Sequence, residues 1–185
     1  MEPNTVRIDR SGDAPVFTFA DSFNVAVHMI DRHIDEGRSD RTAYITEQET
    51  VSYGQLAERV NRCGNALLNA GIPTGSRMLM IVKDCPEFVY LYYGAIKAGI
   101  IPVPINTLLR AADYQYMVDD SKCTALIYSP DFEAEVGPAL AVVSRRPPVV
   151  VLTEGDGGLG DMIAAGSDVL AAHPSDPMAD CFWLY

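Results

Sequence analysis

The chain has 185 residues, of which 48% are hydrophobic and 21% are charged, a composition typical of a globular domain with its own core. Its formal net charge is −11. A surface this acidic repels nucleic-acid backbones and anionic membranes, so neither is an expected partner. No apolar run is long enough to span a bilayer, and the polar start of the chain has no secretory apolar segment. We therefore expect a cytoplasmic protein.

The chain is expected to divide into a short N-terminal arm and one folded unit. Residues 1–18 show little periodicity, and Pro3, Gly12 and Pro15 are placed where they would interrupt a regular element. These residues are predicted to be extended. Residues 19–185 are predicted to fold together as the α/β unit described next.

The first elements of this unit have clear local signals. Apolar residues at helical spacing predict a helix from about residue 21 to 37. Two short segments, 42–46 and 51–53, are separated by polar residues and predict a β-hairpin. Ser52 followed by Gln55 forms a capping-box pattern, which predicts that a long helix begins there. This helix is expected to end before Gly71.

Apolar strands then alternate with helices to the end of the chain. The predicted strands are 77–82, 100–105, 124–128, 148–153 and the closing "CFWLY", 181–185. The predicted helices are 86–98, 111–120, 132–143 and 159–172. This alternation is typical of βαβ units, so it predicts an α/β fold in which a parallel sheet is flanked by helices. The last strand is expected to be buried on both faces.

One glycine-rich loop matches a nucleotide-binding pattern. Gly155–Gly160 reads "GDGGLG", follows an apolar strand, and has Asp176 and Asp180 about 20 residues further on, as in a dinucleotide fingerprint. However, carboxylates crowd the place where a pyrophosphate would bind: Glu154, Asp156 and Asp161. An acidic surface turn is therefore the favoured interpretation.

The other polar and thiol side chains favour structural roles. The four cysteines form no C-x-x-C pair and are predicted to be reduced and buried: Cys63, Cys85, Cys123 and Cys181. His28 and His33 lack the spacing of a zinc pair, and His173 stands alone, so no metal site is predicted. No nucleophile–base pair is present, and no catalytic residue is predicted.

Several segments in a fixed order resemble the N-terminal part of the adenylate-forming enzymes, the family of acyl- and aryl-CoA synthetases, luciferases and peptide-synthetase adenylation domains. "VSYGQL" resembles the entry into the family's first capped helix, and "GIPTGSRML" resembles the turn and strand that follow. Further matches are Pro86-Glu87-Phe88, the signature Gly94, Gly99, Pro104 and Asn106, and the stretch Leu109 to Ser121. Together the motifs cover residues 50–130. Within the family, "VPINTLLRAADYQYMVDDSKCTALIYS" and "FWLY" are most similar to benzoate-CoA ligases.

The resemblance implies the N-terminal subdomain of the adenylate-forming fold and a two-step ligase reaction. An aromatic carboxylate, Mg-ATP and CoA would give an aroyl-CoA, AMP and pyrophosphate. In relatives the "FWLY" strand leads into a lysine-containing loop that cradles the ATP phosphates. The resemblance therefore implies that the chain stops before this loop, that the remainder of the polypeptide supplies the ATP and acid sites, and that residues 1–185 are inactive alone.

One residue remains as a candidate for binding CoA. In some CoA ligases of this family, an arginine just after the proline–asparagine signature reaches the 3′-phosphate of CoA. The matching position is Leu108, so this contact does not carry over. Arg110, two residues on, is the candidate basic group, and a surface arginine at a helix entry is the alternative.

Three alternatives to an aryl-CoA ligase stay open. They are another acyl-CoA synthetase or adenylation subclass, a stand-alone α/β binding module without catalysis, and a dinucleotide-binding domain that uses Gly155–Gly160. A homodimer is also compatible with the sequence.

Overall fold

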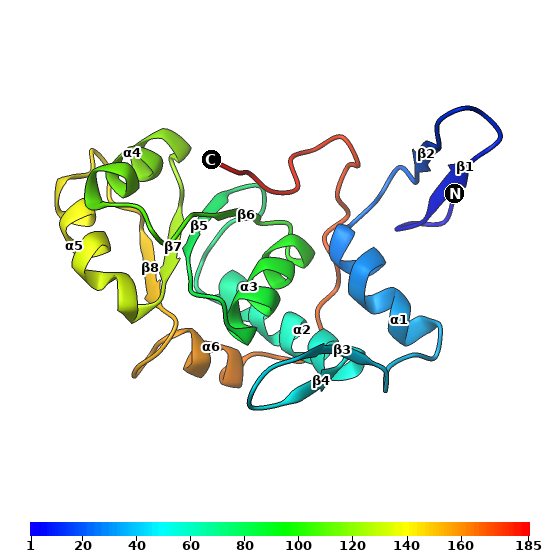
Figure 1. Cartoon of the computed structure of the whole chain (residues 1–185), viewed down its shortest axis with the longest axis horizontal. Coiled ribbons are helices and arrows are strands. Elements are labelled where there is room, and N and C mark those ends of the chain that lie inside the picture. The colour runs from blue at the N-terminus through cyan, green and yellow to red at the C-terminus, as the bar shows by residue number, and fades with distance from the viewer.

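A computed structural model describes all 185 residues (Figure 1). Its centre is a four-stranded parallel sheet with the order β6-β5-β7-β8. The strands are β5 (Arg77–Ile81), β6 (Ile101–Pro104), β7 (Ala125–Tyr128) and β8 (Val149–Leu152). Four of the five strands predicted for this sheet are therefore present, and the predicted α/β class is confirmed.

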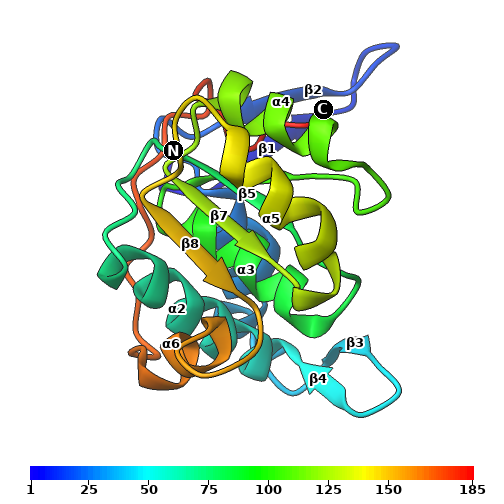
Figure 2. The ribbon, with the colours of Figure 1, turned by 90° about the vertical axis from the view of Figure 1, so that its left-hand side faces the viewer.

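Helices cover both faces of the sheet, as Figure 2 shows. One face packs against α2 (Tyr53–Asn69), α3 (Pro86–Lys97) and α6 (Leu159–Ala165), and the other packs against α4 (Ala111–Ser121) and α5 (Glu133–Val142), which follows the short turn η2 (Pro130–Phe132). Side chains of β5 alternate between the two cores: Met78 and Met80 lie in one, Leu79 and Ile81 in the other. A strand buried on both faces explains the continuous apolar run.

The predicted start of α2 is confirmed. Gln55 N donates to Ser52 Oγ at 3.3 Å, and Ser52 N donates to Gln55 Oε1 at 2.9 Å, which completes the capping box. The preceding hairpin is also confirmed as β3 (Thr42–Ile45) paired with β4 (Thr50–Ser52). Gly71, just after the helix, has a φ of 80°. Glycine adopts this left-handed conformation without the steric strain that a side chain would add, so it ends the helix here.

Helices α2 and α3 cross at two glycines. A Cβ added to Gly64 would lie 2.8 Å from the carbonyl oxygen of Gly94, and a Cβ on Gly94 would lie 3.0 Å from the carbonyl oxygen of Val60. Two helix backbones approach this closely only where side chains are absent from the contact. Gly94 belongs to the family-like signature, so part of that signature records helix packing.

The N-terminal residues contain a β-hairpin, so the expectation that no regular element forms in residues 1–18 is wrong. Strand β1 (Val6–Asp9) pairs antiparallel with β2 (Val16–Phe19). The two prolines and the glycine lie outside the paired residues. They bound the strands and their turn, and so they do not interrupt the ladder.

The first helix begins later than predicted. It consists of a π-helical turn, η1 (Val27–Asp31), followed by α1 (Arg32–Asp35). The backbone before it bonds elsewhere: Phe23 N donates to Ser175 O at 2.8 Å, and Ala26 N donates to the side chain of Asn24 at 3.0 Å. These bonds replace the first helical turn and set the start of the helix.

His33, on α1, makes a contact that depends on pH. Its ring stacks on Tyr53 with centroids 3.8 Å apart and accepts a hydrogen bond from Arg38 Nε at 3.0 Å. Partial burial, and then the charges of Arg38 and Arg32, lower the pKa of His33 below its ordinary value of 6.5. The fold thus prefers the neutral ring. This contribution to stability is present above that ordinary value and is lost as the pH falls toward the lowered one.

We expect the free energy of unfolding of the wild type to decrease from about pH 7.5 to about pH 5.5. The free energy of unfolding of His33→Phe should decrease less steeply over the same range, because phenylalanine keeps the stack and takes no proton. The control is Met29→Phe, an exposed position in the preceding turn, which removes no titrating group and should keep the wild-type slope. Urea denaturation at a series of pH values measures both. Equal slopes for the two variants would rule out His33 as a source of the pH dependence.

Helix α6 is shorter than the predicted helix 159–172. It ends at Ala165 because side chains of α2 hold the next residues in an extended conformation. Arg62 Nη1 donates to Gly166 O at 2.8 Å, and Asn65 Nδ2 donates to Ser167 O at 2.8 Å and to Val169 O at 2.9 Å. These bonds tie the carbonyls to α2 and favour the extended backbone over a further helical turn.

The segment 181–185 does not form the predicted buried strand. One backbone bond, from Trp183 N to Pro102 O at 3.2 Å, joins it to the edge of the sheet at β6. Phe182, Leu184 and Tyr185 are exposed. A single bond defines no ladder, so the segment lies along the edge as an irregular extended chain. Its side chains still meet both layers of helices: Phe182 lies against Tyr92 of α3, and Tyr185 Oη donates to Asp120 of α4 at 2.7 Å.

Candidate functional site

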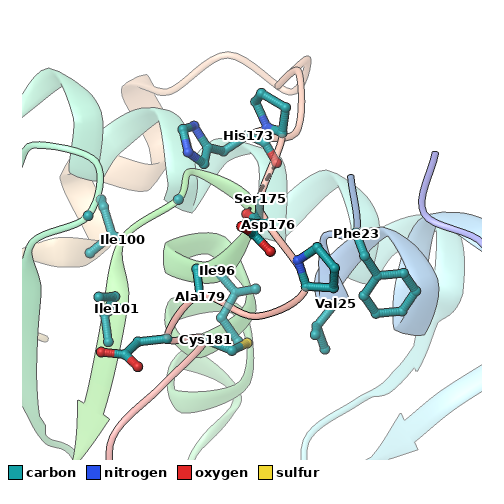
Figure 3. Close-up of a pocket in the computed structure, with 15 residues that line it drawn as sticks. Phe23, Val25, Ile96, Ile100, Ile101, His173, Ser175, Asp176, Ala179 and Cys181 are labelled. Carbon is teal, nitrogen blue, oxygen red and sulfur yellow. Dashed lines mark hydrogen bonds between the residues drawn. The ribbon is translucent and has the colours of Figure 1, made fainter. Parts of the chain in front are cut away.

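A hollow of about 450 Å³ lies between the sheet and the extended segment that follows α6 (Figure 3). Most of its walls come from three parts of the chain: Phe23 and Val25 near the first helix, Ile96 to Ile101 around the end of α3, and His173 to Cys181. Gly75, just before β5, completes them. The volume is in the range of small-molecule pockets. Most of its walls are apolar.

Hydrogen bonds to main-chain groups hold these three parts together. The side-chain amide of Asn24 donates to Ile96 O at 3.0 Å and to His173 O at 3.1 Å, and His173 N donates to Lys97 O at 2.8 Å. Gly99 is required at this junction, because it has a φ of 76° and a Cβ there would lie 2.4 Å from the ring of His173. The walls of the hollow are therefore fixed by main-chain contacts.

The charges around this hollow exclude anionic ligands. Asp176 and Asp180 line it, and neither lysine nor arginine does. Burial raises the pKa of the Cys181 thiol, so the thiolate nucleophile is disfavoured. The hollow also lies at the amino end of β6, whereas ligands of open α/β sheets bind beyond the carboxyl ends. These residues do not fit ATP, CoA or a carboxylate.

A lysine bridges the loops at the carboxyl ends of three strands. Lys83 Nζ lies 2.8 Å from Glu154 Oε1 and 3.0 Å from Asp131 Oδ2, and its backbone N–H donates to Ser129 Oγ at 3.1 Å. The two carboxylates, Glu154 and then Asp131, raise the pKa of Lys83. This position is the one where a phosphate would be expected. The positive charge of Lys83 is already balanced by these two carboxylates, and the carboxylates repel a further anion.

The glycine-rich loop follows β8 and is an acidic turn. Gly155 and Gly157 have positive φ, and Gly157 N donates to the carboxylate of Asp161 at 2.8 Å. Gly158 N donates to Gly155 O at 3.0 Å. Amide groups that a dinucleotide pyrophosphate would need are thus used within the loop. The geometry favours the surface-turn interpretation over the dinucleotide interpretation.

Arg110 lies at the start of α4, in the loop that follows the carboxyl end of β6. Its Nη1 is 3.1 Å from Glu135 Oε1, and its side chain is 78% exposed. The other oxygen of Glu135 accepts from Ala111 N at 2.8 Å, so this carboxylate also caps the helix. Leu108, the position that matches the arginine of some relatives, is exposed. The guanidinium is thus exposed and forms one ion pair, with Glu135.

A second hollow, of about 520 Å³, lies between the β3–β4 hairpin and the start of α3 and had no sequence signal. Tyr44 and Cys85 line it, and burial raises the pKa of Cys85 to about 11. Nearby, Arg59 forms a two-pronged ion pair with Glu49 at 2.6 and 2.7 Å. These residues lie far apart in the sequence and share no local pattern, so no motif predicts the group.

No set of three His, Cys, Asp or Glu side chains is arranged to hold a metal ion. All four cysteines are free; Cys63 and Cys123 are buried, as predicted, whereas Cys85 and Cys181 are half-buried. None of the helices is both long and apolar enough to cross a membrane.

The family-like signature lies at structural positions. Gly94 is at the α2–α3 crossing and Gly99 ends α3 with a left-handed conformation. Pro104 is the last residue of β6. Asn106 Oδ1 accepts from Leu108 N at 2.9 Å and thereby shapes the loop before α4. The motif therefore marks the fold, and it supplies no reacting group.

Comparisons with known proteins agree with the motifs. The model of the AMP-binding enzyme family matches residues 30–180. The chain is 36% identical over 179 residues to the benzoate–CoA ligase of Thauera aromatica, covering 96% of this chain and 34% of that protein. It is 32% identical over 168 residues to the 4-hydroxybenzoate–CoA/benzoate–CoA ligase of Rhodopseudomonas palustris, covering 88% of this chain and 31% of that protein.

Solved structures give the same result. A benzoate CoA ligase from Burkholderia xenovorans LB400 superposes with a TM-score of 0.79 at 31% identity, covering 88% of this chain and 32% of that chain. An anthranilate CoA ligase in complex with anthranoyl-AMP superposes with a TM-score of 0.77 at 26% identity, covering 85% and 30%. The chain thus spans about a third of the length of the curated relatives it matches.

Proposed function

The chain belongs to the AMP-binding enzyme family, and we propose that it forms the N-terminal portion of an ATP-dependent aryl-CoA ligase. The proposed reaction joins benzoate or a related aromatic carboxylate to CoA, with ATP converted to AMP and pyrophosphate. The observation that supports this proposal best is the likeness to benzoate–CoA ligases in sequence and in fold over nearly the whole chain.

We propose that this portion is a scaffold and that the groups that contact ATP, Mg²⁺ and the aromatic acid belong to the rest of the polypeptide. Two features support this division. The hollow in Figure 3 is lined by two carboxylates and by neither lysine nor arginine, and Lys83 is engaged by Asp131 and Glu154. Arg110 is the basic side chain that we assign to CoA, since its guanidinium is exposed and adjoins a helix start. A cytoplasmic location suits these substrates.

An exchange assay tests the proposal. Residues 1–185 alone should show no carboxylate-dependent ATP–pyrophosphate exchange, whereas the polypeptide extended to the length of its relatives should exchange with benzoate faster than with acetate. The measurement follows labelled pyrophosphate entering ATP. Exchange by residues 1–185 alone would contradict the proposed division of groups. A folded, extended polypeptide that is silent with every aromatic acid would contradict the ligase assignment.

A further inference from the structure

The β1–β2 hairpin is amphipathic, and it meets the rest of the chain at Phe19, whose ring packs edge-on against Phe23 with centroids 4.8 Å apart. The pairs Val6–Phe19 and Ile8–Phe17 place four apolar side chains on one face, and the pairs Arg7–Thr18 and Asp9–Val16 lie on the other. Ile8, Phe17 and Phe19 are exposed. The hairpin forms a separate two-stranded sheet at one end of the molecule (Figure 1). A two-stranded hairpin is marginally stable by itself, so this one favours association.

The outer edge of β1 is unpaired. Ala20 N donates to Thr5 O at 3.0 Å, so Thr5 and Ala20 are a hydrogen-bonded pair of the ladder. Hydrogen-bonded and non-hydrogen-bonded pairs alternate in an antiparallel ladder. Arg7 and Asp9 therefore bond toward β2, and the N–H and C=O groups of Val6 and Ile8 face outward. An open edge of this kind is a template for another strand.

The sequence of this edge is complementary to itself. In an antiparallel pairing of two β1 strands centred on Ile8, the outward groups of Ile8 bond to those of Ile8 of the partner subunit. Arg7 then lies opposite Asp9 of the partner subunit, and Asp9 lies opposite Arg7 of the partner subunit. These are non-hydrogen-bonded positions, where facing side chains are closest. Each copy thus supplies the arginine of one charge pair and the aspartate of the other.

We propose that two copies of this chain associate through antiparallel pairing of their β1 strands, centred on Ile8. The pairing joins two hairpins into a four-stranded sheet, with the apolar side chains of both copies on one face. Three or more strands with an apolar face meet the requirement for a stable sheet. The carboxylate of Asp9 is held in place within its own chain, because its Oδ1 accepts from the N–H and hydroxyl of Ser11 at 2.9 and 2.7 Å. Its Oδ2 is left for the arginine.

The open edge of β2 lacks this complementarity. Its residues, Val16–Phe19, carry no charge, so nothing on that edge selects a register or a partner. Like charges that face each other across a ladder destabilise it, whereas opposite charges stabilise it. The charge pattern of β1 is therefore the feature that commits the association to a second copy and to one register.

Charge reversal tests the register directly. Arg7→Asp places two carboxylates opposite each other in both pairs, and Asp9→Arg places two guanidinium groups there. Each variant alone should dimerise about 10-fold more weakly than the wild type, or worse, since two attractive pairs become repulsive. An equimolar mixture of the two variants restores opposite charges in both pairs. The mixture should regain the wild-type dissociation constant, measured by sedimentation equilibrium across a concentration series.

The matched control is Asp13→Arg, the same reversal in the hairpin turn, which should leave dimerisation unchanged. Circular dichroism of each variant should match the wild type, since the reversed side chains are exposed. A wild-type chain that stays monomeric at all concentrations would overturn the proposal. Single reversals that leave the dimer intact, or a mixture that fails to recover it, would overturn this edge and register as well.

Discussion

Replacing Gly64 with alanine is expected to lower the free energy of unfolding by about 2 kcal/mol, although alanine is the better helix former. The new Cβ would lie 2.8 Å from the Gly94 carbonyl oxygen and 2.4 Å from Leu170 Cδ2. Leu170 can move, but the carbonyl belongs to the backbone of α3. The two helices must therefore separate, and the core between them loses contacts. Urea denaturation measures the effect.

The control for this prediction is Gly54→Ala in the first turn of the same helix. There the Cβ meets Ser39 at 3.4 and 3.5 Å, which is ordinary contact. Alanine should leave stability unchanged or raise it by up to about 1 kcal/mol, because it favours the helix. If Gly64→Ala were as stable as Gly54→Ala, the close crossing of α2 and α3 would be refuted.

Removing the carboxylate of Asp31 is expected to cost about 3 kcal/mol of stability. Its Oδ2 lies 2.6 Å from Lys97 Nζ, and the Lys97 side chain is 5% exposed. Asp31→Ala therefore leaves an ammonium group buried without a counterion. The same lysine has its main chain in the junction with His173, so the loss should spread to the segment in Figure 3. Thermal and urea unfolding measure the cost.

Two further variants separate charge from packing at this pair. Asp31→Leu combined with Lys97→Met removes both charges and keeps apolar volume, so it should be more stable than Asp31→Ala. Asp35→Ala, an exposed residue of the next turn, should change stability by less than about 0.5 kcal/mol. A double variant that is no better than Asp31→Ala would contradict the view that an unpaired buried charge causes the loss.

The sheet and its helices were predictable because each element carries a local signal. Ser52 and Gln55 cap α2, Pro86 opens α3, and Gly99 ends it in a conformation that favours glycine. Strands buried on both faces give unbroken apolar runs that need no long-range information. The class of fold and the order of its elements follow from such signals.

Segments fixed by long-range contacts were not predictable. The chain after α6 is extended because Asn61, Arg62 and Asn65 hold its carbonyls, and these residues lie on a helix a hundred positions earlier. The end of the chain was predicted as a strand from its apolar residues alone. A strand also needs a ladder and a covering layer, and 181–185 has one backbone bond to β6.

The hollows were unpredictable for the same reason. The one in Figure 3 depends on Asn24, Ile96 and His173, whose hydrogen bonds join three distant segments. The motifs that resemble the family gave its identity without giving a site, because their glycines, proline and asparagine shape turns and helix contacts. The residues that identify the family in this chain are therefore structural residues.

The most direct test of the central claim is a chimera. Residues 1–185 would replace the matching third of the benzoate–CoA ligase of Thauera aromatica, and benzoyl-CoA formation from benzoate, ATP and CoA would be measured. We expect the chimera to form benzoyl-CoA, and an Arg110→Ala chimera to show a raised KM for CoA with the KM for benzoate unchanged. A chimera that folds with native-like unfolding and forms no benzoyl-CoA would contradict the claim that this chain is the N-terminal portion of such a ligase.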